Sequence, residues 1–322
     1  MQQYKSLIST ILEEGSWCEG RNGRTLNIFG HTMTFYMKDG FPIPTVKQTY
    51  WKTAIKEMYG FTHGFTSAEQ FRSIGVGIWD KNANEEPSWL GNPYRAGADD
   101  LGSVYGEQWR NWKAFKKINA KDKLAWMQAE KSGYEFLDDV VDDAGTYFLY
   151  SKNIDMMMDA LKAIHETPTS RRILFHGWNP ADMDAVALPP CHLLYQFGVD
   201  VPRKRLSLNL YIRSNDIGLG APFNIVEAGF LLNLFAHLTG YEPYKLTYMI
   251  GDAHLYENQL IMANEMLCRE PYPLPQLKIS DRIPKFSETG VFDPSWLNKW
   301  TADDFQLVDY KHHPAISVEM KS

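Results

Sequence analysis

The stretch LSLNLYIRSNDIGLGAPFNIVEAGFLLNLFAHLTG, residues 206–240, determines how this chain is expected to fold. Residues 206–214 are predicted to form a β-strand. Residues 222–240 are predicted to form a helix, with Pro222 at its start and Gly240 at its end. Because this helix is apolar on every side, we expect it to lie buried in the centre of the molecule.

Strands and helices on both sides of this stretch favour an α+β fold around one large sheet, because they mix without a regular strand–helix alternation. We expect a single domain over residues 1–322, with a long surface loop at about 81–102 that is dense in Gly, Pro, Asn and Asp. Predicted helices cover the N-terminus, 45–64 and 151–168, and predicted strands cover a pair or hairpin at 24–37, then 171–178 and 192–201.

Composition excludes several classes of protein. The chain has 322 residues, 44% of them hydrophobic and 22% charged, as expected for a globular protein. The net charge of −6 offers no broad attraction to nucleic acid. No apolar run approaches the roughly 20 residues of a membrane helix, and no signal peptide is recognised. Cys18, Cys191 and Cys268 are too few and too far apart for a disulfide framework or a zinc site, so we expect a reducing cytoplasm and no metal.

The segment ALPPCHLLYQF, residues 187–197, places Cys191 and His192 side by side after two prolines. A buried cysteine is common in protein cores, and this interpretation is favoured for Cys191 taken alone. The alternative is a nucleophile, since a thiolate is the reactive form and cations lower its pKa. Arg171, Arg172 and Arg213 lie close by in sequence, so both interpretations stay open.

The segment RSNDIGLGAPFN, residues 213–224, carries donors suited to a phosphate or a carboxylate. Arg213, Ser214 and Asn215 supply these donors, and Asp216 lies beside a glycine-rich turn. Asn224 offers both a donor and an acceptor to an amide-like edge such as that of uracil. A strand end with a polar turn and a helix cap is the equally weighted alternative.

Three more residues are candidates with structural alternatives. In GDAHLYENQ, residues 251–259, His254 and Tyr256 share one side of an extended segment and could contact the hydroxyls of a sugar. Glu57 lies on an otherwise apolar helix face and could act as a general acid or base with a raised pKa. Taken alone, structural roles are favoured for all three.

Taken together, these segments resemble the thymidylate synthase family. The resemblance begins at about residue 20 and extends to the closing segment HHPAISVEM. It implies the family's fold, with one large mixed sheet packed by helices and one sheet face forming a homodimer interface. The segments that carry it, in the family's order and spacing, are GVGIWD, DLGSVYGEQWR, SRRILFHGWNP, ALPPCH, RSND.GLGAPFN, GDAHLYEN and REPYPLP.

The resemblance implies a folate-dependent one-carbon transfer to C5 of dUMP through a covalent Cys191 adduct. Catalytic positions would be Cys191, Glu57, Tyr105, His192, Asp216 and Trp79. The nucleotide would be bound by Arg213, Ser214, Asn224, His254 and Tyr256, by Arg171 and Arg172 from the partner subunit, and by Arg21 or Arg24. Methylenetetrahydrofolate, the co-substrate, would be bound by Lys47, Ile78, Trp79, Leu188, Asp216, Leu219, Gly220 and Phe223.

Several departures from the family's pattern affect how tightly the site closes. The chain ends in EMKS, Ile212 replaces a usual glutamine, Gly60 replaces a usual tryptophan, and the loop after the first arginine reads GRNGRT. Relaxed closure admits water. These departures favour a dUMP hydroxymethylase making 5-hydroxymethyl-dUMP, which would suit a virus that modifies its DNA. The close alternative is a thymidylate synthase making dTMP and dihydrofolate. An idle, nucleotide-binding regulator is the alternative from another class.

Overall fold

A computed structural model describes residues 1–20 and 22–319 of the chain. Its centre is a six-stranded sheet in the order β1-β2-β9-β8-β7-β6. The strands of this sheet are β1 (Ser16–Gly20), β2 (Gly23–Tyr36), β6 (Leu174–His176), β7 (His192–Asp200), β8 (Arg205–Asp216) and β9 (Glu242–Tyr256). The α+β prediction and the single large mixed sheet are confirmed.

The sheet is mixed because one pair of neighbours, β8 and β9, runs parallel while the other pairs run antiparallel. Parallel neighbours need a crossover connection, and α9 (Gly220–Thr239) supplies it between β8 and β9. The crossover brings the end of β8, Arg213–Asp216, next to Asp252–His254 of β9. Two polar segments far apart in sequence therefore meet at one end of the sheet.

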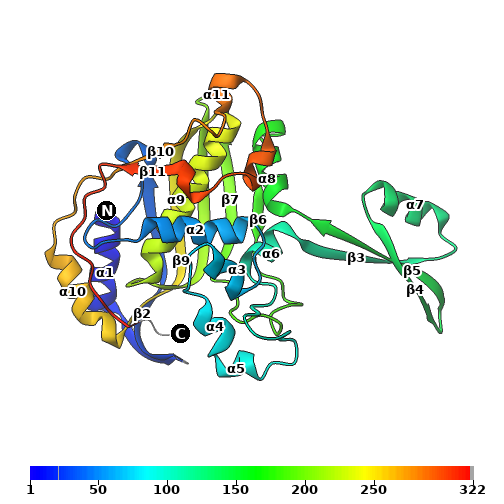
Figure 1. Ribbon diagram of the computed structural model, residues 1–322, viewed down its shortest axis with the longest axis horizontal. Coiled ribbons are helices and arrows are strands. Elements are labelled where there is room, and N and C mark those ends of the chain that lie inside the picture. The colour runs from blue at the N-terminus through cyan, green and yellow to red at the C-terminus, as the bar shows by residue number, and fades with distance from the viewer. Residues whose placement is uncertain (21, 320–322) are drawn as a thin grey trace.

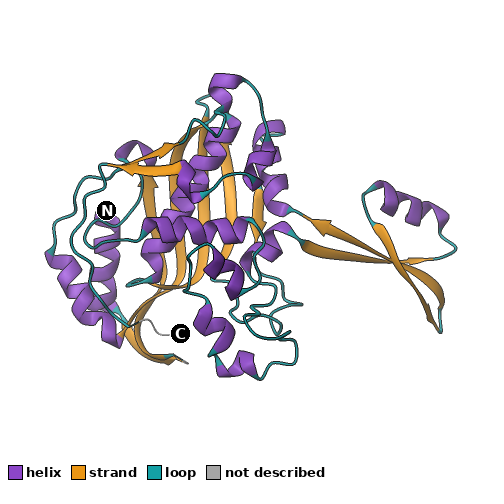
Figure 2. Cartoon of the chain, viewed as in Figure 1, coloured by secondary structure: helices purple, strands orange, loops and turns teal. Residues whose placement is uncertain are grey.

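One face of the sheet packs against helices, as Figures 1 and 2 show. Along β8, Leu206, Leu208, Leu210 and Ile212 are fully buried, while the residues between them are half-buried. This alternation follows from the two-residue period of a strand. The larger helices are α1 (Gln2–Glu14), α2 (Trp51–Thr62), α8 (Met156–Glu166), α9 and α10 (Leu260–Cys268).

Helix α9 is buried in the core, as its all-round apolarity predicts. Its length and composition alone would also suit a membrane span, although no membrane helix was expected from the sequence. However, 78% of its most apolar window is buried inside the fold, so its apolar surface is covered by protein. Gly240 ends the helix with a φ of 80°, a left-handed conformation that favours glycine.

Short elements fill the lower part of the molecule in Figure 1 and the edge beside α9. The segment expected as a surface loop, 81–102, contains two short helices, and its Trp89 and Leu101 side chains are buried. The short helices are α3 (Ala68–Ser73), α4 (Asp80–Asn84), α5 (Pro87–Leu90), α6 (Tyr105–Arg110) and α11 (Phe286–Thr289). A two-stranded sheet pairs β10 (Gln276–Ile279) with β11 (Phe305–Val308). Four 3-10 turns span Met37–Asp39, Glu257–Gln259, Pro294–Asn298 and Ala302–Asp304.

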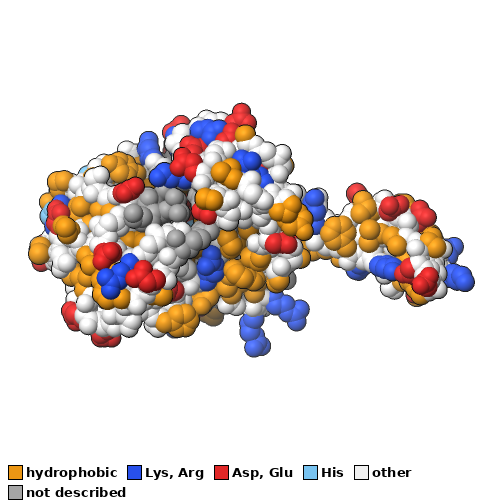
Figure 3. Space-filling model, turned by 90° about the horizontal axis from the view of Figure 1, so that it is seen from below, with side chains coloured by type: hydrophobic (Ala, Val, Ile, Leu, Met, Phe, Trp, Pro, Cys, Tyr) orange, Lys and Arg blue, Asp and Glu red, His pale blue; other side chains and the backbone are white. Residues whose placement is uncertain are grey.

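An arm of residues 112–154 projects from the body of the molecule (Figures 1 and 3). It is a three-stranded antiparallel sheet in the order β3-β5-β4 with one helix. Its elements are β3 (Trp112–Asn119), α7 (Lys123–Lys131), β4 (Glu135–Asp142) and β5 (Gly145–Ile154). The sequence analysis did not predict this arm.

Three predicted elements have clearly different limits in the structure. The predicted helix at 45–64 is α2, which begins only at Trp51 and ends at Thr62. Residues 24–37, predicted as a strand pair or hairpin, form most of the single strand β2, whose partners are β1 and β9. The predicted helix at 151–168 begins only at Met156, because the residues before it complete β5 of the arm. Asp155 caps this helix by accepting the N–H of Met158.

Candidate active site

A cavity of about 510 Å³ opens at the end of the sheet where β8 and β9 meet α2 and the start of α9. The predicted site residues that line it are Lys47, Glu57, Ile78, Trp79, Tyr105, Leu188, Cys191, His192, Arg213, Ser214, Asp216, Leu219, Gly220, Phe223, Asn224, His254 and Tyr256. Asn215, predicted as a donor, also lines it, and the remaining lining residues are Asn22, Gln48, Thr49, Tyr50, Asn82, Pro222, Ala315 and Ile316.

Cys191 lies half-buried in the wall of this cavity, immediately before β7. The two preceding prolines are held by Arg213, whose Nε donates to the Pro190 carbonyl at 2.9 Å and whose Nη2 donates to the Pro189 carbonyl at 2.7 Å. The backbone N–H of Arg213 also donates to the Cys191 carbonyl at 3.0 Å. Arg213 and Cys191 are therefore fixed to one another through the backbone.

Tyr105 fixes Cys191 from the opposite side. Its hydroxyl accepts the backbone N–H of Cys191 at 3.0 Å, and its ring stacks on Phe61 with centroids 4.7 Å apart. The backbone of Tyr105 has a φ of 24°, an unfavourable value for a residue with a side chain, and such strain is common at functional sites. Burial is the main reason that the pKa of Tyr105 lies well above its usual range, so its hydroxyl stays protonated near neutral pH.

Glu57 extends from α2 into the buried side of the cavity and is 7% exposed. Trp79 Nε1 donates to its Oε1 at 3.0 Å. Burial raises the pKa of Glu57 to about 7, against the lowering effect of hydrogen bonds from Glu227 and Trp79. A carboxyl group that titrates near neutral pH can both give and take a proton during a reaction.

His192 follows Cys191 but points into the core, where it is 3% exposed. Its Nδ1 lies 3.1 Å from the Tyr195 hydroxyl. Burial lowers the pKa of His192 to about 4, against a raising hydrogen bond with Asn224, so the ring is neutral near pH 7. A neutral ring orients its neighbours and does not supply a positive charge to the Cys191 thiol.

Asn224 is held by a chain of buried polar groups. Its Oδ1 accepts Asn215 Nδ2 at 2.9 Å, and Asn215 Oδ1 accepts the Tyr248 hydroxyl at 2.6 Å. Asn215 was predicted to be a donor for a phosphate or a carboxylate; in this structure its side chain is 3% exposed and its amide donates to Asn224. The alternation of buried positions along β8 breaks after Ile212, so the two-residue period of the strand does not predict the burial of Asn215.

His254 and Tyr256 lie next to each other on β9, with ring centroids 5.3 Å apart in an edge-on arrangement. Asp252 Oδ1 lies 2.7 Å from His254 Nδ1, and Asp252 Oδ2 accepts Asn27 Nδ2 at 2.6 Å. These contacts fix the His254 ring through its Nδ1, and His254 lines the cavity.

Asp216 organises the turn between β8 and α9. Its Oδ1 accepts the N–H groups of Gly218 at 2.8 Å and Leu219 at 3.0 Å, and its Oδ2 accepts Gln259 Nε2 at 2.9 Å. Lys47 Nζ donates to the carbonyl of the same Gly218 at 2.6 Å. Burial lowers the pKa of Lys47 to about 8, against a raising effect of Asp216, so this ammonium group is poorly solvated. Asp216 and Lys47 thus stabilise this turn and also line the cavity.

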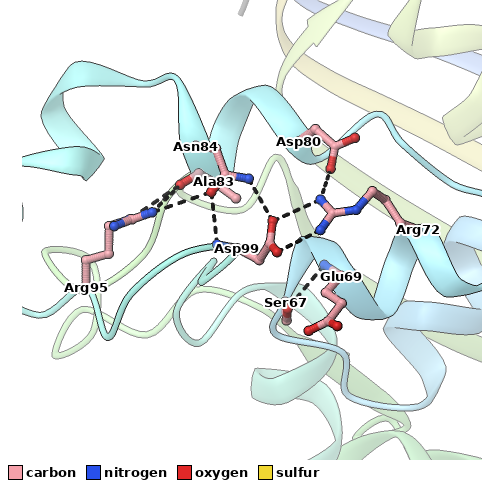
Figure 4. Close-up of polar contacts among 8 residues, drawn as sticks. All are labelled: Ser67, Glu69, Arg72, Asp80, Ala83, Asn84, Arg95 and Asp99. Atoms are coloured by element: carbon pink, nitrogen blue, oxygen red, sulfur yellow. Dashed lines mark hydrogen bonds and ion pairs between the residues drawn. The ribbon is translucent and has the colours of Figure 1, made fainter.

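The segment that carries Trp79 is held by Arg72 on α3 (Figure 4). Its guanidinium donates to both carboxylate oxygens of Asp99, at 2.9 and 2.7 Å, and also to Asp80, the residue after Trp79. Asn84 Nδ2 donates to Asp99 at 2.8 Å. The Arg72 guanidinium is the main reason that the pKa of Asp99 is lowered to about 2, so the pairing is present at any physiological pH.

Among the described residues, three of the arginines predicted to bind the nucleotide do not line the cavity: Arg24, Arg171 and Arg172. Arg171 and Arg172 are exposed in the segment just before β6, and they do not line the cavity of their own chain. Arg21 lies outside the described residues. Arg24 is paired with Glu19 at 3.3 Å and with Glu257 at 3.3 Å.

Two departures from the family's pattern have local compensation in the structure. A β-carbon on Gly60 would lie only 2.2 Å from Phe71 Cε1, so the Phe71 ring fills the space beside this glycine and stacks near Trp79. Near the end of the chain, the N–H of His313 donates to the Thr45 carbonyl at 2.9 Å and Arg269 Nη1 donates to the Pro314 carbonyl at 2.8 Å. These contacts place Ile316 at the cavity; residues 320–322, including Lys321 and Ser322, lie outside the described part.

The sequence model of the thymidylate synthase family matches residues 2–322. This chain belongs to the thymidylate synthase family. It is 48% identical to the thymidylate synthase of Bordetella parapertussis and 46% identical to that of Pseudomonas syringae, each over 99% of both chains. The human thymidylate synthase is 35% identical over 99% of this chain and 90% of the human one. The chain is therefore a transferase of the thymidylate synthase family, as the resemblance implied.

Glu227 on α9 is a buried ionisable residue of the site that was not predicted from the sequence. It is 0% exposed and lies behind Glu57, Asn224 and His192. The available signal was a single acidic residue within an otherwise apolar helix, three positions after Asn224. An acid in such a helix is rarely placed there for packing alone.

Proposed function

We propose that this thymidylate synthase family member converts dUMP to dTMP, with methylenetetrahydrofolate becoming dihydrofolate. One observation carries the proposal: Cys191 lies in the cavity wall, fixed by Tyr105 and Arg213, and the titratable Glu57 lines the same cavity. Members of this family bind dUMP and use methylenetetrahydrofolate as co-substrate.

The nucleotide fits the end of the cavity formed by β8 and β9. Arg213 and Ser214 are assigned to the phosphate, because a guanidinium and a hydroxyl are strong donors to phosphate oxygens. His254 and Tyr256 are assigned to the deoxyribose 3′-hydroxyl. Asn224 is assigned to the pyrimidine edge, where an amide matches the donor and acceptor of uracil.

The proposed chemistry begins when the Cys191 thiolate adds to C6 of the pyrimidine, which places negative charge on O4 and makes C5 a nucleophile. Glu57 and Tyr105 are assigned to the proton transfers at O4 and C5, since both lie buried at the cavity wall. The bound folate supplies the one-carbon unit and the hydride. Loss of the C5 proton and departure of Cys191 from C6 restore the ring and the free thiolate.

The folate fits the other end of the cavity, because the residues there suit a flat, partly apolar ring system with an anionic tail. Ile78, Leu219 and Phe223, with Leu188 and Trp79, offer apolar contact surface, and Gly220 leaves room for a ring to approach the backbone. Asp216 and Lys47 supply polar contacts. Among the described residues no group of His, Cys, Asp and Glu is arranged to hold a metal ion.

We also propose a homodimer that forms through the sheet face opposite α9. Along β8 the residues on this face, such as Ser207, Asn209 and Tyr211, are half-buried polar or aromatic side chains suited to a pairing surface. In the dimer Arg171 and Arg172 would extend into the partner's phosphate site, which accounts for their exposure in the single chain. Arg21 remains a proposed phosphate contact outside the described residues.

The methyl product is proposed over the hydroxymethyl product that the departures from the family's pattern favoured. The relatives that match over nearly their whole length are named thymidylate synthases. Phe71 fills the space at Gly60, and hydrogen bonds hold the segment that places Ile316 at the cavity. These contacts support a cavity that closes without the residues that the family usually has there.

The proposal is tested by following dihydrofolate formation from dUMP and methylenetetrahydrofolate by absorbance, in the wild type and in Cys191→Ser. We expect turnover in the wild type and loss of at least about a thousandfold in the variant, because a serine hydroxyl is a far weaker nucleophile near neutral pH. Calorimetry should show that the variant still binds dUMP. Binding without turnover in the wild type would instead support an idle, regulatory protein.

A further inference from the structure

The Glu227 carboxyl group is buried with an incomplete set of partners. It is 0% exposed, and no hydrogen-bond donor among the described residues reaches its Oε1. Its Oε2 accepts Asn224 Nδ2 at 3.3 Å and lies 3.8 Å from His192 Nε2. A buried ionised carboxylate with one neutral donor is unfavourable, so the ionisation state of Glu227 requires an explanation.

The explanation lies in the contact between Glu227 and Glu57. Both carboxyl groups are buried between α9 and α2, and each affects the ionisation of the other. Two neighbouring carboxylates do not both ionise in a buried site, so one proton remains on the pair. His192 does not supply a compensating charge, because burial keeps its ring neutral.

The environments of the two groups decide which one keeps the proton. Glu57 lines the cavity and receives the Trp79 N–H, so its carboxylate form has one donor even without Glu227. Glu227 has no exposure and lies farther inside the fold. The proton therefore rests on Glu227, and its Oε1, which no donor reaches, becomes a donor itself.

We propose that Glu227 is a positioning residue that stays protonated near neutral pH and donates a hydrogen bond to the Glu57 carboxylate, which sets the pH at which Glu57 exchanges its proton with the substrate. This inference rests on the proposed role of Glu57 in the reaction. It assigns to α9 a second function besides packing: Asn224 orients the pyrimidine, and Glu227, one turn later, controls the acid on α2.

Other titratable groups face this pair and must be considered in any pH profile. From α6 there is Tyr105, from β7 and the residue before it there are His192, Tyr195 and Cys191, and from β9 there is Tyr248. Burial raises the pKa values of the three tyrosines well above their usual range, and the His192 pKa is lowered to about 4. A midpoint near pH 7 that Glu57→Gln removes is assigned to the two carboxyl groups, and one that remains in this variant belongs to Cys191.

The test compares Glu227→Gln with Glu227→Met, two uncharged side chains of similar length. The glutamine amide can accept from Asn224 and donate to Glu57, whereas the methionine cannot donate. In the pH profile of kcat we expect the midpoint to stay within about half a unit of the wild type in E227Q, and to rise by about one unit or more in E227M, a tenfold change in proton affinity. An unchanged midpoint in E227M, equal rises in both variants, or a fall in either variant would overturn the proposal.

A second measurement does not depend on whether E227M folds. Infrared spectra of the wild type should show the carbonyl stretch of a buried protonated carboxylic acid above pH 7, and this band should be missing in E227Q. A band that persists in E227Q would overturn the proposal, because the proton would then rest on another group. Wild-type protein that shows the band but makes no dTMP would contradict the proposed function and leave the assignment of the proton intact.

Discussion

Arg213 illustrates how single residues prepare this site. Backbone carbonyls of Pro189 and Pro190 hold its guanidinium, and among the described residues no carboxylate pairs with it. Its positive charge is therefore positioned but not neutralised, which suits the binding of a doubly charged phosphate. The same bonds fix the backbone next to Cys191, so one residue would serve both the proposed phosphate site and the proposed nucleophile.

A substitution of Trp79 tests the electrostatics of Glu57. The Trp79 N–H stabilises the charged form of Glu57 and so lowers a pKa that burial raises to about 7. In Trp79→Phe this donor is lost, the carboxylate becomes less favourable, and the midpoint in the pH profile of kcat should rise by about one unit. Trp89→Phe is the matched control, because it removes a buried N–H bond to the Asp100 carbonyl, outside the cavity. A midpoint that falls or stays in W79F would show that this N–H does not act on Glu57.

Residue types within the site were predictable, but the directions of the side chains were not. The resemblance named Cys191, Asn224 and His254, and all three line the cavity. It did not indicate that the Asn215 side chain is buried between Asn224 and Tyr248 or that Glu227 is buried near Glu57, because both depend on contacts between different elements of the fold. Hydrogen bonds of this kind belong to the folded state alone.

At the scale of elements, α3 and α4 form a support for the aromatic wall of the cavity. Arg72 of α3 pairs with Asp99 and with Asp80, which begins α4 directly after Trp79. The three side chains are partly exposed, at 40% for Arg72, 39% for Asp80 and 22% for Asp99, so their pairing contributes little to global stability. We therefore expect its main effect to be on the position of Trp79.

Substitution Arg72→Lys tests this support. A lysine cannot make the two-pronged contact with Asp99 and reach Asp80 at the same time, so Trp79 should lose its fixed position. We expect kcat/KM to fall by about tenfold, since small displacements of positioning residues are costly, while the melting temperature changes little. Arg282→Lys is the control, because it breaks a similar pair with Asp304 away from the cavity. Equal kcat/KM in R72K and wild type would contradict the account.

At the scale of the whole molecule, the arm of residues 112–154 stands apart from the site. Trp112 and Ile154 are paired at its base, so the chain enters and leaves the arm at neighbouring positions. Several large apolar side chains on the arm are exposed, including Phe115, Leu124 and Val141. The arm thus has little buried surface to stabilise it, and segments of this kind open locally more easily than a core sheet.

Replacing residues 113–153 with a two-residue Asn-Gly turn tests the independence of the arm. Because the paired ends are already adjacent, the short turn should connect them without strain. We expect kcat and the KM for dUMP to stay within about threefold of the wild type, since no arm residue lines the cavity. In the intact protein, amide hydrogens of β3–β5 should exchange faster than those of β8 and β9. Loss of turnover in the shortened protein would show that the arm supports the site.

The architecture could be predicted from the sequence where the hydrophobic pattern is strong, and the prediction failed where this pattern is weak. The apolar run of α9 predicted a buried central helix, and this is confirmed. The arm was missed because its strands are short of core contacts and carry many charged residues, so their pattern resembles a solvated surface. Residues 24–37 were split into two strands because a single strand of this length is unusual.

The most direct test of the account is to weigh the nucleotide product after turnover of dUMP with methylenetetrahydrofolate in water enriched with heavy oxygen. We predict a product heavier than dUMP by CH2, without heavy oxygen, and an equal amount of dihydrofolate. A product heavier by CH2O that contains heavy oxygen, with no dihydrofolate, would contradict the account: water would then reach the methylene group, and the protein would be a hydroxymethylase.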